Sequence, residues 1–164
     1  MIGEVKLDTI ELMIGSHVGC MRRVQNIKKG EVLTENFGLD SNASWNTDID
    51  GAQSELALAK FTNTYWGGAF FYKDKTRADV CDWQVRSTRH QNGCLIVRKK
   101  DIPKIKPDAI MVLVTVDTQT FRIAGSMVFA ETMKPEYWRD DKPGREGKGG
   151  GAWWVEQKHL GDTL

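Results

Sequence analysis

The chain has 164 residues, of which 40% are hydrophobic, so it is long enough for one sizeable core and too short for two comfortable domains. Its 23 lysines and arginines nearly balance its 22 aspartates and glutamates, and a net charge of +1 gives no global argument for an anionic partner. No apolar run approaches the roughly 20 residues that span a bilayer, and acidic residues interrupt the apolar N-terminus, which argues against a secretory signal. We therefore expect one soluble, cytoplasmic domain over residues 1–164, without a membrane partner.

The first expected element is a long amphipathic helix over residues 7–28. Apolar side chains recur close to the helical i, i+3, i+4 spacing, at Leu7, Ile10, Ile14, Val18, Met21 and Val24. Asp8 or Thr9 can cap its N-terminus, and the helix is expected to end near Gly30. Its last turns carry four bases, Arg22, Arg23, Lys28 and Lys29. These bases suit the negative end of the helix dipole, and we interpret them as a solvated helix end, with a phosphate-contacting face as the alternative.

A loop and a second helix follow. Residues 31–50 are rich in Asn, Asp, Ser and Thr without useful periodicity, which predicts a long surface loop. We expect Trp45 within it to have a packing role, with a lid or anchor as the alternative. Residues 51–63 are small and strongly helix-forming, which predicts an alanine-rich helix that packs closely against a sheet and carries Glu55.

The centre of the chain is rich in β-forming runs separated by turn residues. The expected strands lie within residues 69–73, 78–87, 94–101, 110–117 and 120–133. Asn92-Gly93 is a strong hairpin signal, so we expect an α+β domain with a mixed, mainly antiparallel sheet flanked by helices. Residues 139–151 are dense in Gly, Lys and Asp and predict a long flexible loop, followed by a terminal strand or edge segment.

The strand expected over residues 79–86 is unusually polar. Successive strand residues alternate faces, so one face would show Asp82, Gln84 and Arg86 and the other Asp79, Cys81, Trp83 and Val85. Buried polar groups without partners are costly. The polar face therefore either lines a cleft or faces water, with Gln84 and Arg86 in cross-strand pairs.

A phosphodiesterase that uses Mg²⁺ needs hard oxygen ligands and a nearby cation that stabilises charge on the phosphate. Asp79, Gln84 and Arg86 supply those residue types in that order. Glu55, on a helix that packs across the sheet, is the fourth candidate. These residues predict hydrolysis of a phosphodiester assisted by Mg²⁺ or Mn²⁺.

The segments GAQSELALAK, ADV and WQVRST resemble the helix glutamate, the aspartate and the (D/E)-x-K element of PD-(D/E)xK nucleases. With LIVRKKD, FRIAGSMVFAE and WWVEQKHL, the chain also resembles small phage proteins of the restriction-endonuclease-like class over roughly residues 7–160. The resemblance implies a restriction-endonuclease-like core in which Glu55 is the helix carboxylate and Asp79 the principal metal ligand. Gln84 replaces the acidic ligand and Arg86 the lysine.

Several positions depart from the family pattern. Gln84 offers a neutral carbonyl oxygen where the family has a carboxylate, and Arg86 keeps the positive charge but cannot act as a base. Ala78 stands where the family has proline. Asp79 and Gln84 fall on opposite faces of a regular strand, so they meet only if a bulge or bend near Cys81 intervenes. Without such a bend, Asp82 is the reserve metal ligand.

The resemblance thus implies a phage-type endo- or exonuclease that cuts DNA in the cytoplasm, which is that of the host cell if a phage encodes the chain. The alternative is a catalytically weakened relative that binds nucleic acid or a host protein, and a structural phage component is a third reading. The candidate contacts to the DNA backbone are Arg89, His90, Lys142, Arg145 and Lys148. The possibility of a homodimer stays open.

Overall fold

A computed structural model describes residues 1–29, 41–69, 77–140 and 151–164 of the chain. Its elements are, in order, β1 (Gly3–Lys6), α1 (Thr9–Lys28), α2 (Ser41–Phe61), β2 (Trp83–Thr88), β3 (Leu95–Arg98), η1 (Lys99–Asp101), β4 (Ile110–Asp117), β5 (Thr120–Val128), α3 (Phe129–Thr132), η2 (Pro135–Tyr137), β6 (Trp138–Arg139), β7 (Ala152–Val155) and η3 (Gln157–His159). The α+β class is confirmed. Within these residues, no helix has the length and apolar character needed to cross a membrane.

The strands form two separate sheets. The larger has the order β1-β5-β4-β2, with antiparallel pairs except between β4 and the edge strand β2, which run parallel. The smaller is antiparallel, in the order β3-β7-β6. The expectation of a mixed, mainly antiparallel sheet is therefore confirmed. The expected hairpin at Asn92-Gly93 is wrong, because the chain turns there but the strands on either side, β2 and β3, enter different sheets.

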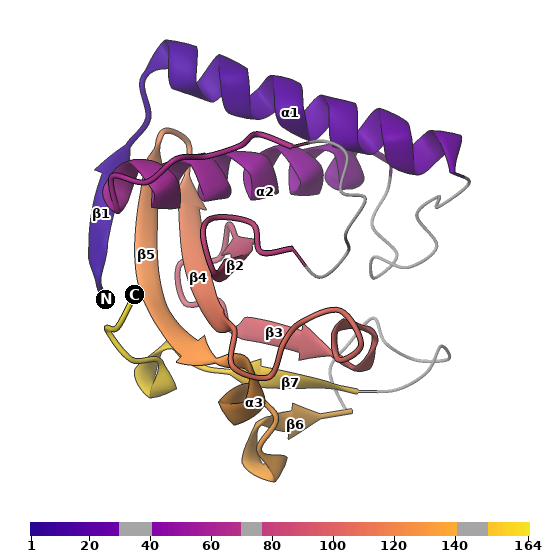
Figure 1. Cartoon of the computed structure of the whole chain (residues 1–164), viewed down its shortest axis with the longest axis vertical. Helices are drawn as coiled ribbons and strands as arrows, with labels where there is room; N and C mark the ends of the chain where they lie inside the picture. The colour runs from indigo at the N-terminus through magenta and orange to yellow at the C-terminus, as the bar shows by residue number, and fades with distance from the viewer. Residues whose placement is uncertain (30–40, 70–76, 141–150) are drawn as a thin grey trace.

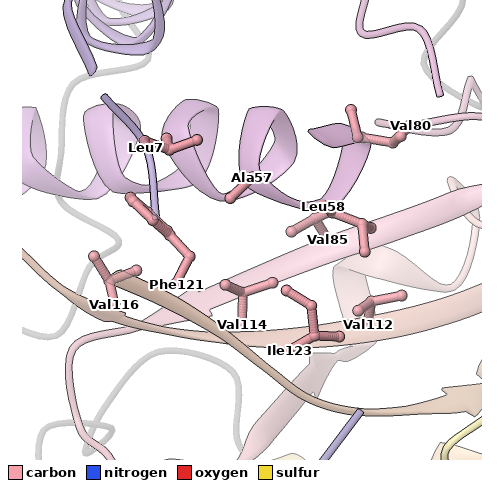
Figure 2. Packing of buried hydrophobic residues seen from close by; sticks show 11 residues of the cluster. Leu7, Ala57, Leu58, Val80, Val85, Val112, Val114, Val116, Phe121 and Ile123 are labelled. Atoms are coloured by element: carbon pink, nitrogen blue, oxygen red, sulfur yellow. The ribbon is translucent and has the colours of Figure 1, made fainter. Parts of the chain in front are cut away.

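The helices and the two sheets stack in layers, with two buried apolar clusters between them. Helix α2 lies on one face of the larger sheet, and α1 lies on α2 rather than on the sheet (Figure 1). Ala57 and Leu58 of α2 pack with Val112, Val114 and Ile123 of the sheet in a fully buried cluster (Figure 2). A second cluster fills the space between the opposite face of that sheet and the smaller sheet, with Leu95, Val97, Met111, Leu113 and Val155 among its members.

Helix α1 begins as the sequence predicts, but it buries a different face. Asp8 caps it in a reciprocal pair with Glu11, in which the backbone N–H of each residue donates to the carboxylate of the other, at 2.9 and 2.7 Å. Ile10 and Ile14, expected in the core, are 69% and 50% exposed. The buried positions of α1 are instead Gly15, Val18, Gly19 and Arg23.

Glycines explain this choice of face. A Cβ atom built on Gly19 would lie 2.5 Å from Ile49 Cα, and one on Gly15 would lie 2.7 Å from Gln53 Cγ. The two helices can approach this closely only where α1 has no side chain. The requirement for close approach therefore outweighs the burial of the larger residues Ile10 and Ile14.

Two expected loops need correction. Residues 41–50 belong to α2, so the loop expected over residues 31–50 is wrong from Ser41 onward, and Trp45 lies in a helix. The polar side chains that suggested a loop find partners there, because Asp48 and Asp50 pair with arginines. Arg139 lies in β6, inside the loop expected over 139–151. Residues 31–40, 141–150 and most of the strand expected at 69–73 lie outside the described residues.

The packing of α1 on α2 yields a stability prediction. Gly19→Ala places a methyl group against the backbone of Ile49 and should lower the free energy of unfolding by about 1–2 kcal/mol, after the gain in helix propensity is subtracted. Gly51→Ala, in α2 with no atom within 4 Å of its added Cβ, is the matched control and should raise that free energy by about 0.5–1 kcal/mol. Urea denaturation measures both, and equal effects would contradict the close approach.

Candidate functional site

The expected strand over residues 79–86 is a tight turn followed by β2. The Trp83 N–H donates to Val80 O at 2.8 Å and the Val80 N–H donates to Trp83 O at 3.2 Å, while Cys81 has a positive φ of 47°. The chain therefore has the bend near Cys81 on which a meeting of Asp79 and Gln84 depends. The turn folds Asp79 back against the outer edge of β2, where its Oδ2 accepts a hydrogen bond from the Val85 N–H at 2.9 Å.

Glu55 projects from α2 and is 5% exposed. Its two oxygens accept hydrogen bonds from both terminal nitrogens of Arg22, at 2.5 and 2.7 Å. The Trp66 indole N–H donates to Oε2 at 3.1 Å, and Arg22 Nε donates to Ala69 O at 3.0 Å. This bidentate pair fixes the orientation of the carboxylate and joins α1, α2 and the segment after α2.

Glu55 and Asp79 act on one another electrostatically. Burial raises the pKa of Glu55 to about 6, the hydrogen bonds from Arg22 oppose that rise, and the charge of Asp79 adds to it. Burial also raises the pKa of Asp79, against the opposing effects of the Val85 N–H, Arg86 and Arg22. The buried Glu55 and the partly buried Asp79 are therefore electrostatically coupled, and nearby arginines only partly offset the cost of ionising them.

The other two residues of the predicted site lie differently. Trp83 and Val85 pack with the cluster under α2, so Gln84 and Arg86 lie on the opposite face of β2. The Gln84 amide donates to Arg77 O at 3.3 Å, and the strand separates it from Glu55. Arg86 donates to Val85 O at 3.1 Å and lies 3.7 Å from Asp101 of η1. Arg86 acts on Asp79 through its charge, since Asp79 lies at the edge that separates the two faces.

The remaining candidates are more peripheral. Asp82, the reserve ligand for a regular strand, is exposed in the turn. His90 is exposed. Arg89 holds both oxygens of Asp50 at 2.6 and 2.8 Å, although its side chain is 62% exposed. The predicted contacts Lys142, Arg145 and Lys148 lie outside the described residues.

Sequence reasoning missed the contribution of α1. The solvated helix end predicted at Arg22 and Arg23 is wrong, because Arg23 is 4% exposed and lies 3.8 Å from Asp48. Burial raises the pKa of Asp48, against the charges of Arg23 and Arg22. The signal was present in the sequence, because both arginines continue the helix face that begins with Gly15 and Gly19.

A fit to Mg²⁺ can be judged from the donors. The described residues contain no group of three or more His, Cys, Asp or Glu side chains placed to hold a metal. Mg²⁺, however, is commonly held by one or two carboxylates together with water and substrate phosphate, and Glu55 and Asp79 supply two hard oxygen donors. Both Glu55 oxygens accept hydrogen bonds from Arg22, so a cation bound here competes with the guanidinium group.

Comparison of the chain with protein-family models, curated proteins and solved structures found no match.

The raised pKa of Glu55 sets an expected pH dependence. The folded protein holds this proton more tightly than the unfolded chain does, so Glu55 contributes stability that is fully present below a pH of about 4.5 and lost as the pH rises through about 6. The unfolding free energy of the wild type, relative to that of Glu55→Gln, should therefore increase by about 2 kcal/mol between pH 7 and pH 4.5.

Urea titrations at several pH values measure this difference. Glu156→Gln is the control, because Lys158 holds the pKa of the exposed Glu156 carboxyl below its usual range and no gain on acidification is expected from it. A wild-type curve parallel to that of Glu55→Gln over this interval would show that Glu55 ionises as an ordinary glutamate.

Proposed function

We propose that the chain is a nuclease on a restriction-endonuclease-like core that hydrolyses phosphodiester bonds of DNA with Mg²⁺ or Mn²⁺, and that Glu55 and Asp79 hold the cation. The observation that supports this most strongly is the electrostatic coupling of a buried carboxylate from α2 with a partly buried one from the turn before β2, with a raised pKa at each. A structural ion pair needs only one carboxylate for Arg22. The second carboxylate leaves negative charge that a divalent cation would compensate.

Each candidate residue has its own role in the proposed reaction. Glu55 and Asp79 hold the cation, which when bound lowers the pKa of a coordinated water and withdraws charge from the phosphate. Arg86 is only 31% exposed at its side chain and lies at the long separation of 3.7 Å from Asp101. Its guanidinium therefore keeps donor capacity for a phosphate oxygen. Gln84 has no ligand role in this proposal, because it lies on the opposite face of β2 from Glu55.

One observation favours the alternative of a catalytically weakened protein that binds nucleic acid or a host protein. Arg22 already neutralises Glu55 through two short hydrogen bonds, at 2.5 and 2.7 Å. If that pair persists whenever the protein is folded, the carboxylates support the fold and no cation binds. The two functions therefore differ in whether Arg22 can be displaced.

A cleavage assay tests the proposed activity directly. Wild-type protein with Mg²⁺ or Mn²⁺ should cut single-stranded, duplex or branched DNA, and Asp79→Asn or Glu55→Gln should lower the rate at least about 100-fold by removing a metal ligand. Asp82→Asn, a neighbouring exposed aspartate, is the matched control and should keep its activity. Intact DNA in all wild-type reactions would reject the nuclease, and electrophoretic binding assays would then test the alternative.

The competition between Arg22 and a cation gives a test that needs no activity. Arg22→Gln removes the bidentate partner of Glu55, so Mn²⁺ should raise the melting temperature of this variant more than that of the wild type. Arg89→Gln is the control, because it also frees a paired carboxylate, Asp50, but one without Asp79 beside it. Equal Mn²⁺ effects on the two variants would show that Glu55 and Asp79 do not form a cation site.

A further inference from the structure

Helix α1 has an apolar face that no described part of the chain covers. The helix forms the outer layer of the structure, with α2 on its inner side (Figure 1). Ile10, Met13 and Ile14 are 69%, 67% and 50% exposed. Contiguous apolar residues on one helix face, rather than single scattered ones, indicate a surface that another chain covers.

The spacing on this face is that of a helix-pairing seam. Positions separated by alternating steps of four and three residues carry Ile10, Ile14, His17, Met21, Val24 and Lys28, which we call the outer seam. Side chains repeating every 3.5 residues stay in line along a neighbouring helix, where each inserts between residues of the partner. The inner face of α1, by contrast, carries Gly15 and Gly19 and is already packed on α2. The outer seam therefore fits a second helix of similar length.

The charges at the two ends of the seam indicate how a partner helix would be oriented. The seam carries no Asp, Glu, Lys or Arg from Ile10 to Val24, whereas the exposed Asp8 precedes it and the exposed Lys28 and Lys29 end it. Two parallel copies of α1 would bring Asp8 near Asp8 and Lys28 near Lys28. Two antiparallel copies bring the acidic end of each near the basic end of the other and also oppose the helix dipoles.

We propose that the outer seam of α1 pairs with the same seam of a second copy of this chain, in an antiparallel arrangement about a two-fold axis. In antiparallel coiled coils, the two alternating kinds of seam position face one another. This register places Ile14 against Val24 of the partner subunit and His17 against Met21 of the partner subunit. The aliphatic stem of Lys28 then covers Ile10 of the partner subunit, with its ammonium group directed toward the acidic end. Such a dimer does not cover Glu55 or Asp79, because the outer seam lies on the face of α1 opposite Gly15 and Gly19, which pack on α2.

The interface is small. A helix of 20 residues is about 30 Å long, and one helix pair lies at the low end of the size range of specific interfaces. We therefore expect a reversible dimer with a dissociation constant on the order of 10 µM.

Sedimentation equilibrium over a range of concentrations tests the dimer. Wild-type protein should dimerise, and Ile14→Glu should raise the dissociation constant at least about 100-fold, because each dimer then buries two carboxylates without partners. Ile102→Glu alters an isoleucine of similar exposure, 44%, away from α1 and should leave the dimer unchanged. Circular dichroism verifies that both variants are folded. A wild-type protein that stays monomeric at about 100 µM, or a dimer that Ile14→Glu leaves intact, overturns the proposal.

Disulfide trapping tests the antiparallel register. In a background with Cys20→Ser and Cys81→Ser, which removes the exposed thiol of Cys81, a mixture of Ile14→Cys and Val24→Cys proteins should form a cross-linked heterodimer on mild oxidation, because these positions face one another across the axis. Either protein oxidised alone should cross-link much less. Efficient self-cross-linking of Val24→Cys would indicate parallel helices and overturn the antiparallel proposal.

Discussion

The pairing of Arg22 with Glu55 is the interaction on which the candidate site depends. It joins the outer helix α1 to α2, and through Trp66 and Ala69 it also holds the segment that follows α2. A buried ion pair is weak as a source of net stability, because desolvation of both charges offsets their attraction. Its removal is nevertheless costly, since it leaves one charge buried without a partner. The pair therefore determines where α1 and α2 must lie relative to one another more than it determines how stable they are.

Asp79 depends on a second constraint, the exposed edge of the larger sheet. Strand β2 is an edge strand, and the Val85 N–H points away from β4, where an unpaired donor would invite another strand. The tight turn around Cys81 brings Asp79 back along this edge, and its carboxylate accepts that donor. The same turn brings Asp79 within the electrostatic influence of Glu55 above the sheet and of Arg86 from the opposite face. The same turn thus both protects the edge strand and places Asp79 where its charge acts on Glu55.

Helix α1 shows how one element can serve two surfaces. Its inner face consists of small residues and two arginines, because α2 approaches closely and carries carboxylates at Asp48 and Glu55. Its outer face keeps the larger apolar residues, which the fold of a single chain leaves in water. The proposed dimer would give those residues a function while the inner face keeps its role in orienting Glu55.

The sequence by itself determined the α+β class and the position of α1, and it singled out Glu55 and Asp79, whose charges act on one another in the structure. These features depend on local spacing and residue type. Counting positions shows that Asp79 and Gln84 share a face only with a bend near Cys81, but it does not show whether that bend forms. Only the tertiary structure decided which face of α1 is buried, that Arg22 holds Glu55, and that Gln84 lies on the face of β2 opposite α2. Periodicity shows that a helix has two faces, but the depth to which its neighbour approaches decides which face is buried. That depth depends on residues far away in the sequence, among them Ile49 and Gln53, which α1 itself does not encode.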